Sequence, residues 1–190
     1  MQGFDTSVFP KLDYDRPDRF NCALKDMENF FVSFEKELQP VREKALIYKE
    51  AFFNLDSFIQ SFTSSICPYC GTVCCAHQHG LPELADIVGL LAMDLKIPEY
   101  DLSLERGGMC QFMGEKGCVL PRHHRPYRCT WYFCDPLLVQ IEIGPPRQYR
   151  TFIKDVEGLA KARGNMLSEF YPLWSRHSKN IDGSKEKSLK

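Results

Sequence analysis

The sequence has no long uncharged apolar run and none of the short motifs that identify common enzyme classes. No stretch reaches the roughly 18 residues that a membrane-spanning helix needs. The first residues do not combine a basic segment with an apolar one, as a secretory signal does. A Gly-rich dinucleotide fingerprint, a P-loop, a Gly-x-Ser-x-Gly elbow and a His-Glu-x-x-His motif are all missing. We therefore expect a soluble cytoplasmic protein whose cofactor chemistry, if any, takes place at a metal site.

The chain also has almost no excess of charge of either sign. Its 24 Lys and Arg residues face 25 Asp and Glu residues, for a formal net charge of -1. Such a balance gives no overall attraction to nucleic acid or to an anionic membrane, so we expect neither as a partner. With 190 residues the chain is long enough for one domain with its own core. We predict an arm over residues 1–20, a single helical domain over 21–176 and a disordered polar tail over 177–190.

Cysteine, in contrast, is abundant: the chain has nine, and eight of them lie between residues 67 and 134. Because a reducing cytosol disfavours disulfides, clustered cysteines there indicate metal or redox chemistry. A secreted disulfide-bonded protein is the alternative, but nine is an odd number and Cys22 stands apart. The candidate metal ligands are Cys67, Cys70, Cys74, Cys75, Cys110, Cys118, Cys129 and Cys134.

The first cysteine group contains the spacing Cys67-x-x-Cys70. Two cysteines at this spacing can turn both sulfurs toward one ion through a tight turn. The adjacent Cys74 and Cys75 cannot easily point at the same ion, so some cysteines are candidates for a supporting role or a second site.

Histidines and an arginine cluster accompany the cysteines. His77 and His79 are a further candidate ligand pair, although side chains two positions apart in an extended chain do not point at one ion as easily as cysteines in a turn. Arg122, Arg125 and Arg128 are expected to lower the thiol pKa values and to offset the charge of a thiolate site. The alternative is an RNA or phosphate patch that combines these arginines with three aromatic residues, Tyr127, Trp131 and Tyr132.

These motifs carry a resemblance to a known family. The order Cys-x2-Cys-x3-Cys-Cys, then Cys-x-Phe-Met, then Arg125-Pro126-x-x-Cys129, resembles the YkgJ-type cysteine-cluster family over about residues 66–135. That family is described as a zinc- or iron-chelating domain, and a related cluster occurs in flagellin lysine methylases, which are linked to a [4Fe-4S] cluster. Many members have two residues before the Cys-Cys pair where this chain has three, which leaves open whether Cys74 or Cys75 is a ligand.

The ligand types favour an iron–sulfur cluster over zinc, and [4Fe-4S] is the candidate cluster type. Structural zinc sites commonly use two Cys-x2-Cys knuckles, and this chain has only one. An iron–sulfur cluster takes cysteines from scattered positions and needs an apolar shell. The candidate shell residues are Ile66, Val73, Phe112, Tyr127, Trp131 and Phe133.

Apolar periodicity predicts a mainly helical fold, in which long N-terminal and C-terminal helices pack around a loop-rich cysteine cluster. A heptad seam runs from Met27 to Phe62, and Pro40 either kinks one helix or lies in the first turn of a second. A helix from Pro82 is expected to end at Ile97 and to bring the two cysteine groups together, with Asp86 and Asp94 solvated. Residues 135–143 suit either a helical turn or a short strand, and 148–174 read as a helix beside the N-terminal one.

Three functions follow from these patterns. The first is a metal-binding protein with an iron–sulfur cluster. The second is a cluster-dependent enzyme that acts on a protein, as the likeness to lysine methylases implies. The third is a zinc-stapled module that binds a protein partner. The seam over 27–62 packs within its own domain in our preferred interpretation, and a homodimeric coiled coil is the alternative.

Overall fold

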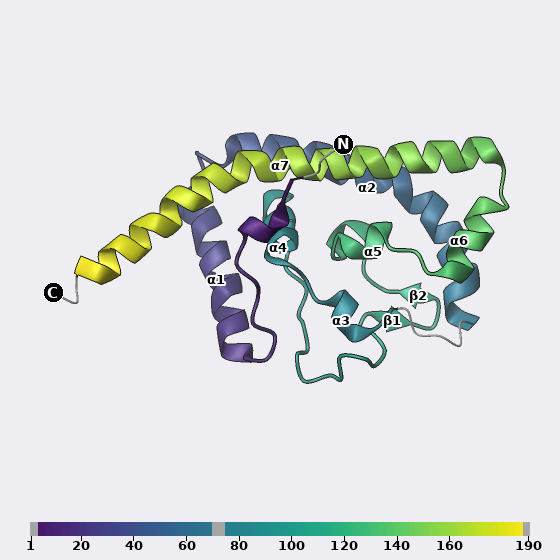
Figure 1. Cartoon of the computed structure of the whole chain (residues 1–190), viewed down its shortest axis with the longest axis horizontal. Coiled ribbons are helices and arrows are strands. Elements are labelled where there is room, and N and C mark those ends of the chain that lie inside the picture. Colours follow the sequence, from purple (N-terminus) through teal and green to yellow (C-terminus); the bar gives the residue numbers. More distant parts are fainter. Residues whose placement is uncertain (1–3, 70–74, 188–190) are drawn as a thin grey trace.

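The computed structural model describes residues 4–69 and 75–187, with side chains as far as residue 178. The fold is mainly helical, as predicted (Figure 1). Its elements are, in order, η1 (Thr6–Val8), α1 (Pro17–Ser33), α2 (Gln39–Ile66), η2 (Cys67–Tyr69), α3 (His77–Gly80), α4 (Leu84–Ala92), β1 (Met113–Gly114), β2 (Gly117–Cys118), η3 (Arg122–His124), α5 (Arg128–Trp131), α6 (Asp135–Glu142) and α7 (Pro146–Lys187). None of the described helices combines the length and the apolar character that crossing a membrane requires.

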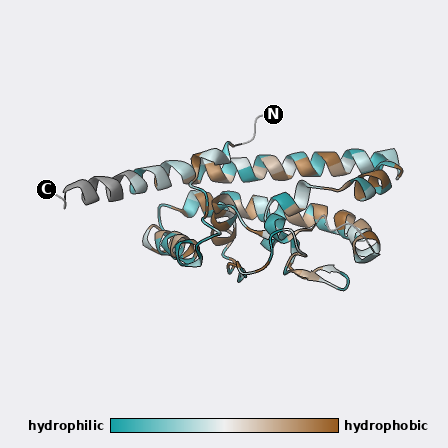
Figure 2. Ribbon diagram, turned by 60° about the horizontal axis from the view of Figure 1, so that its bottom comes forward, coloured by the Kyte–Doolittle hydropathy of each residue, from teal (hydrophilic) through white to brown (hydrophobic). Residues whose placement is uncertain are grey.

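The helices α2 and α7 lie side by side and form the frame of the molecule (Figure 1). Hydrophobic positions recur along both of them (Figure 2). The predicted seam is buried within the chain: Val41, Ala45 and Leu55 are each 0% exposed. From α7, Leu159, Leu167 and Phe170 join the same core. A buried leucine or phenylalanine side chain contributes roughly 1.5–3 kcal/mol, so the contact between these two helices stabilises the fold substantially.

Proline positions explain where several helices begin. Pro40 lies in the first turn of α2 and separates it from α1, so the seam belongs to two helices and not to one kinked helix. Pro17 and Pro136 occupy the first turns of α1 and α6 in the same way. A proline there loses no intrahelical hydrogen bond, because the first N–H groups of a helix have no partner within it. Residues 135–142 therefore form a helix, where the sequence left helix and strand open.

The C-terminal helix is longer than the sequence predicts. The expected helix ends near Trp174 and a disordered tail follows, whereas α7 continues to Lys187 and extends past α1 (Figure 1). Residues 177–187 are helical in the structure, where the sequence predicts a disordered tail. Once a helix is anchored by its packed part, each further residue adds a hydrogen bond without a new nucleation cost, so polar residues can prolong it.

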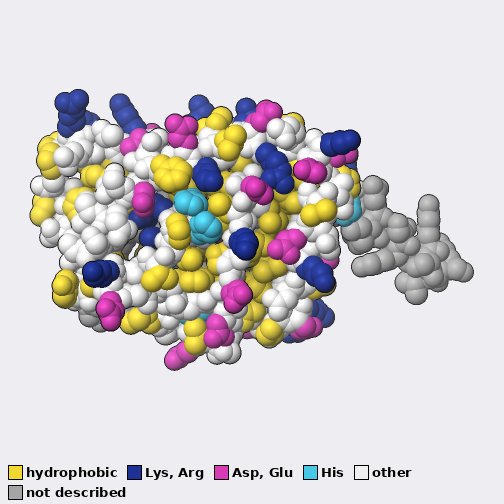
Figure 3. Space-filling view, turned by 180° about the vertical axis from the view of Figure 1, so that it is seen from behind, with side chains coloured by type: hydrophobic (Ala, Val, Ile, Leu, Met, Phe, Trp, Pro, Cys, Tyr) yellow, Lys and Arg dark blue, Asp and Glu magenta, His cyan; other side chains and the backbone are white. Residues whose placement is uncertain are grey.

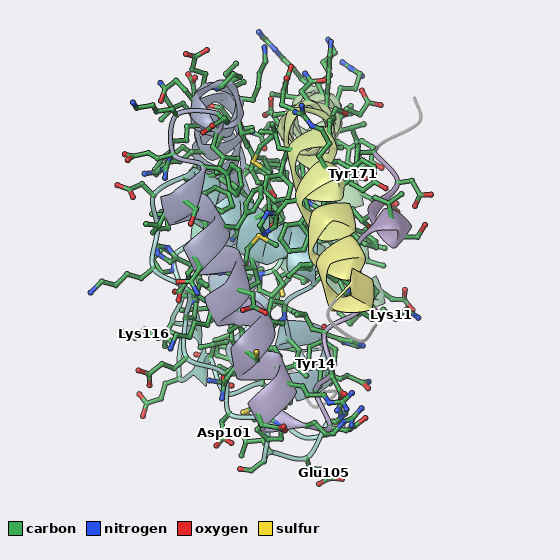
Figure 4. All side chains as sticks on the ribbon, turned by 90° about the vertical axis from the view of Figure 1, so that its left-hand side faces the viewer. Lys11, Tyr14, Asp101, Glu105, Lys116 and Tyr171 are labelled. Carbon is green, nitrogen blue, oxygen red and sulfur yellow. The ribbon has the colours of Figure 1, made fainter. Side chains whose placement is uncertain are left out.

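The N-terminal arm packs on the body, and its helix begins at Pro17, four residues earlier than the predicted domain boundary. Phe9 and Leu12 are buried, 6% and 7% exposed. The ring centroid of Phe9 lies 6.0 Å from that of Phe170 and 5.9 Å from that of Tyr171. Tyr171 is labelled on α7 in Figure 4. The arm thus completes the core at one end of the frame.

Candidate metal centre

Backbone pairing brings the two cysteine groups together. The N–H of Cys110 donates to the carbonyl of Cys75 at 2.9 Å, and Ala76 and Met109 form an antiparallel bridge. The N–H of His77 donates to the carbonyl of Gly108 at 2.8 Å. The chain leaves this region through α4, which ends at Ala92, and returns through the loop that precedes Cys110. The predicted approach of the two groups is confirmed.

A two-stranded hairpin positions Cys118. Strands β1 and β2 pair Met113 with Cys118 and Gly114 with Gly117. Gly117 has a φ of 101°, in the left-handed region that residues with a Cβ rarely adopt. Glycine therefore suits this turn between the two strands. The guanidinium of Arg125 donates from Nε to the carbonyl of Leu120 at 2.9 Å and from Nη2 to that of Cys118 at 3.4 Å, which ties the strand end to the following loop.

Six of the eight candidate ligands line one cavity of about 100 Å³. The other two, Cys70 and Cys74, lie outside the described residues. Cys22 lies elsewhere, exposed on α1 with its thiol 3.7 Å from Asp26. The cavity is lined by Cys67, Cys75, Cys110, Cys118, Cys129 and Cys134, together with Ile59, Thr63, Ala76, His79, Gly80, Phe112, Met113, Gly117, Arg122, Arg125, Arg128, Tyr132, Phe133 and Leu137.

The backbone at Gly80 lies close to the thiol of Cys110. A Cβ at Gly80 would lie 2.5 Å from the Sγ of Cys110, well inside van der Waals contact. The short helix α3 therefore ends in a residue without a side chain where the thiol of Cys110 approaches. A close approach of backbone to a functional group is a recurrent use of glycine.

Burial dominates the chemistry of the thiols. It raises the pKa of Cys129 to about 12, and the neighbouring Cys118, Asp86, Cys110 and Cys75 add to the effect. Burial also raises the pKa of Cys110. Both shifts run opposite to the direction expected from the neighbouring arginines, because desolvation penalises a buried thiolate. A metal that binds here must displace protons from neutral thiols.

The three arginines of the cluster differ in their partners. Arg125 is engaged with backbone carbonyls, and Arg128 donates from Nη2 to Glu83 at 3.4 Å. Arg122 is 3% exposed and donates from Nε to Asp56 of α2 at 2.8 Å. Its pKa is lowered, first by burial and then by Arg125. Only Arg122 brings a deeply buried guanidinium to the cavity.

The two candidate histidines occupy different surroundings. Both lie in the short helix α3 and not in an extended segment. His79 lines the cavity, and its carbonyl accepts the thiol of Cys129 at 3.6 Å. His77 does not line the cavity; it is 1% exposed, and neither ring nitrogen has a hydrogen-bond partner among the described residues. His79 is therefore the better placed of the two.

Asp86 is a residue that sequence reasoning missed. It was expected to be solvated, as Asp94 is, but its side chain is only 7% exposed. Its carboxylate accepts the N–H of Glu83 at 2.9 Å and that of Tyr127 at 3.1 Å, and it pairs with Arg163 of α7 at 3.4 Å. Asp86 therefore connects the start of α4 to the loop before α5 and to α7 of the frame. The capping-box spacing of Glu83 and Asp86 was the sequence signal for part of this role.

Four of the six predicted shell residues line one of two cavities, whereas Ile66 lines neither of them and Val73 lies outside the described residues. Phe112 and Phe133 line the cysteine cavity, whereas Tyr127 and Trp131 line a neighbouring cavity of about 270 Å³. Arg128 borders both. The second cavity is lined by Phe4, Thr6, Leu81, Glu83, Asp86, Pro126, Tyr127, Arg128, Trp131 and Arg163.

The donor set fits a thiolate-bound metal in its chemistry. The cavity offers soft sulfur ligands, a glycine cradle and a buried cation. In the described part of the chain, no three cysteine, histidine, aspartate or glutamate side chains converge closely enough to hold one metal ion. Cys70, which the Cys67-x-x-Cys70 spacing pairs with Cys67, and Cys74 are predicted ligands that lie outside the described residues.

On the face seen in Figure 3, Lys and Arg side chains are interspersed with Asp and Glu and do not gather over one area. Arg122 donates a hydrogen bond from Nε to Asp56, and Arg125 donates one from Nε to the carbonyl of Leu120.

Comparison of the chain with protein-family models, curated proteins and solved structures finds no match.

Proposed function

We propose that the chain is a metal-binding protein that holds an iron–sulfur cluster in the cysteine cavity. Cys67, Cys75, Cys110, Cys118, Cys129 and Cys134 line that cavity, and Cys70 and Cys74 complete the proposed ligand set. The observation that carries the proposal is that six cysteines, from segments far apart in the sequence, line the same cavity. A cytosolic protein with this arrangement has a use for sulfur ligands beyond packing.

Iron–sulfur is preferred to zinc because of the cavity walls. Ile59, Phe112, Phe133 and Leu137 surround the cysteines with apolar surface, which suits a cluster whose stability depends on limited solvent access. The chain also has a single Cys-x2-Cys knuckle, whereas structural zinc sites commonly use two. Zinc remains the alternative metal, in which case the protein is a stapled module that binds a protein partner.

The test is the metal and acid-labile sulfide content of protein purified without air, with its visible absorption spectrum. Iron and sulfide in similar amounts support the cluster, and stoichiometric zinc without sulfide supports the stapled module. Cys129→Ser, in the cavity, should lose the metal, whereas Cys22→Ser, on the surface of α1, should retain it. Wild-type protein with neither metal, or equal metal content in both variants, would overturn the proposal.

A second candidate is a cluster-dependent enzyme that modifies proteins, similar to lysine methylases. The observation in its favour is the cavity of about 270 Å³ beside the cysteines, with aromatic walls and four charged residues. Such a cavity next to a metal centre provides room for a substrate. Mass spectrometry of lysine-containing peptides, incubated with the loaded, reduced protein and S-adenosylmethionine, should detect an added methyl group. Unchanged peptides would leave the metal-binding role without this activity.

A further inference from the structure

The guanidinium of Arg122 is poorly compensated for so buried a charge. The residue is 3% exposed, and its Nη1 and Nη2 atoms are buried without a hydrogen-bond partner among the described residues. Only Nε is engaged, by Asp56 at 2.8 Å. The Asp56 side chain is itself 47% exposed, so part of its charge is screened by water. Four N–H donors of Arg122 therefore lack an acceptor next to the cysteine cavity.

Such an arrangement is costly unless an anion is present. An arginine remains charged at all physiological pH values, and a buried charge without full compensation destabilises a fold strongly. An apolar side chain of similar size would serve better if Arg122 were only a packing residue. The neighbouring Arg125 adds positive charge, and its own donors are directed to the carbonyls of Leu120 and Cys118. The structure thus has a surplus of positive charge at this wall.

The ligand that matches this wall is a metal centre with a net negative charge. Four thiolates around a divalent ion carry two negative charges more than the ion neutralises, and a four-cysteine iron–sulfur cluster is likewise anionic. A site with two thiolates and two neutral histidines would be neutral and would leave the Arg122 charge uncompensated. The wall therefore distinguishes between classes of metal site.

We propose that Arg122 is the counter-charge of an anionic, thiolate-rich metal centre in the cysteine cavity, and that its Nη1 and Nη2 donate hydrogen bonds to the sulfur atoms. This inference rests on the proposed function. For an iron–sulfur centre, reduction by one electron adds a further negative charge, which Arg122 stabilises. Arg122 consequently raises the midpoint potential of the centre as well as its retention.

The variant that separates this role from a structural one is Arg122→Met. It removes charge and donors but keeps an unbranched side chain in the same space. If Arg122 serves the metal centre, the metal-free variant unfolds at the same or a higher temperature than metal-free wild type, while the loaded variant loses its metal more readily. If Arg122 serves only its pair with Asp56, the metal-free variant unfolds at a lower temperature, and the proposal is overturned.

The binding measurement uses full-length protein loaded without air. Competition with a chromophoric chelator should show at least a tenfold weaker retention in Arg122→Met, and Arg122→Lys should lie between the variant and wild type. For iron, a dye-mediated titration with dithionite as the electron donor should give a more negative potential. A tenfold change in the equilibrium constant for reduction corresponds to about 59 mV for a one-electron couple. Arg150→Gln, at an exposed position on α7, is the matched control and should equal wild type.

The outcomes separate the two proposals. Wild-type protein that binds no metal defeats the proposed function, and this inference with it. Wild-type protein that binds metal, with Arg122→Met equal to it in retention and in potential, defeats the role of Arg122 alone. Weaker retention in Arg122→Met but not in Arg150→Gln supports both.

Discussion

The helical frame and the cysteine region of this protein satisfy their side chains in different ways. In the frame, the seam of α2 from Val41 to Ile59 is buried at 0–3% exposure against its own chain, by apolar contacts. In the cysteine region the regular elements are short, and buried polar atoms lack partners. Among the described residues, every side chain with such an unpartnered buried atom, except Arg163, lies between Cys75 and Cys134.

The difference indicates two sources of stability. Apolar burial is sufficient for α2 and α7, since it depends on nothing outside the chain. The cysteine region buries a charge and hydrogen-bonding groups that have no partner among the described residues. The regions meet at Asp86, whose carboxylate pairs with Arg163 of the frame and accepts the N–H of Tyr127. Stability of the frame and order of the cysteine region should therefore be separable by experiment.

Removal of the proposed metal should have the largest effect, and it should be confined to one region. Treatment of loaded protein with a chelator is expected to speed amide hydrogen exchange over residues 105–134 by about tenfold or more, because this region has few apolar contacts of its own. Exchange in the buried turns of α2 and α7 should change little. Mass spectrometry of the exchanged peptides makes the comparison, and a uniform increase along the chain would contradict it.

A substitution that creates a cavity in the helical frame should lower stability without affecting metal content. Phe170 is 0% exposed and stacks on Phe31, with ring centroids 5.6 Å apart. Phe170→Ala is expected to lower the free energy of unfolding by about 3–5 kcal/mol, in urea, while the metal content per folded chain stays the same. Phe53→Ala, at a residue 58% exposed on α2, should change stability by less than about 0.5 kcal/mol. Metal loss in Phe170→Ala would show that the regions are not separable.

Two glycine substitutions sharpen the same comparison. Gly80→Ala places a Cβ 2.5 Å from the Sγ of Cys110, so the sulfur must move, and metal retention should fall about tenfold or more in a chelator competition. Gly158→Ala on α7 meets no atom within 4 Å. It should leave metal retention unchanged and stabilise the helix by up to about 1 kcal/mol. Equal retention in the two variants would remove Gly80 from the site.

The smallest effect is expected for the contact between the N-terminal arm and the start of α4, and it should appear at alkaline pH. Tyr14 (Figure 4) donates to the carbonyl of Pro82 at 2.6 Å. Burial, and then Asp86 and Glu83, raise its pKa from 10.0 to about 12. A raised pKa means that the folded state holds the phenolic proton more tightly. The contribution of Tyr14 is therefore complete below pH 10 and is lost as the pH rises through 12.

Tyr14→Phe tests this contribution. The variant should lose about 1 kcal/mol of stability at pH 7, because the hydrogen bond to Pro82 is gone. Its unfolding free energy should then fall less steeply than that of wild type between pH 10 and 12 in urea titrations. A residual slope is expected, because burial also raises the pKa values of Tyr48 and Tyr100. Parallel curves for variant and wild type would assign the alkaline sensitivity to those two tyrosines.

The sequence by itself determined the helical frame. The steps of three and four between Val41, Tyr48 and Leu55 mark one face of a helix, and that face is buried. Pro40 set the start of α2, because a proline fits a first turn and disrupts an interior one. These features are local, since the period of a helix and the geometry of proline do not depend on distant residues.

Tertiary structure alone decided how the cysteine region is built. No periodicity in the sequence places Cys67 and Cys134 on one cavity, or Gly80 against Cys110. Nor does a local pattern show that Asp86 meets Arg163, 77 positions away, or that Arg122 is buried with free donors while Arg125 is not. Burial and pairing depend on which segments pack together. Charge and hydrogen bonding acquire their energy from those surroundings, and so only the folded chain assigned these residues their roles.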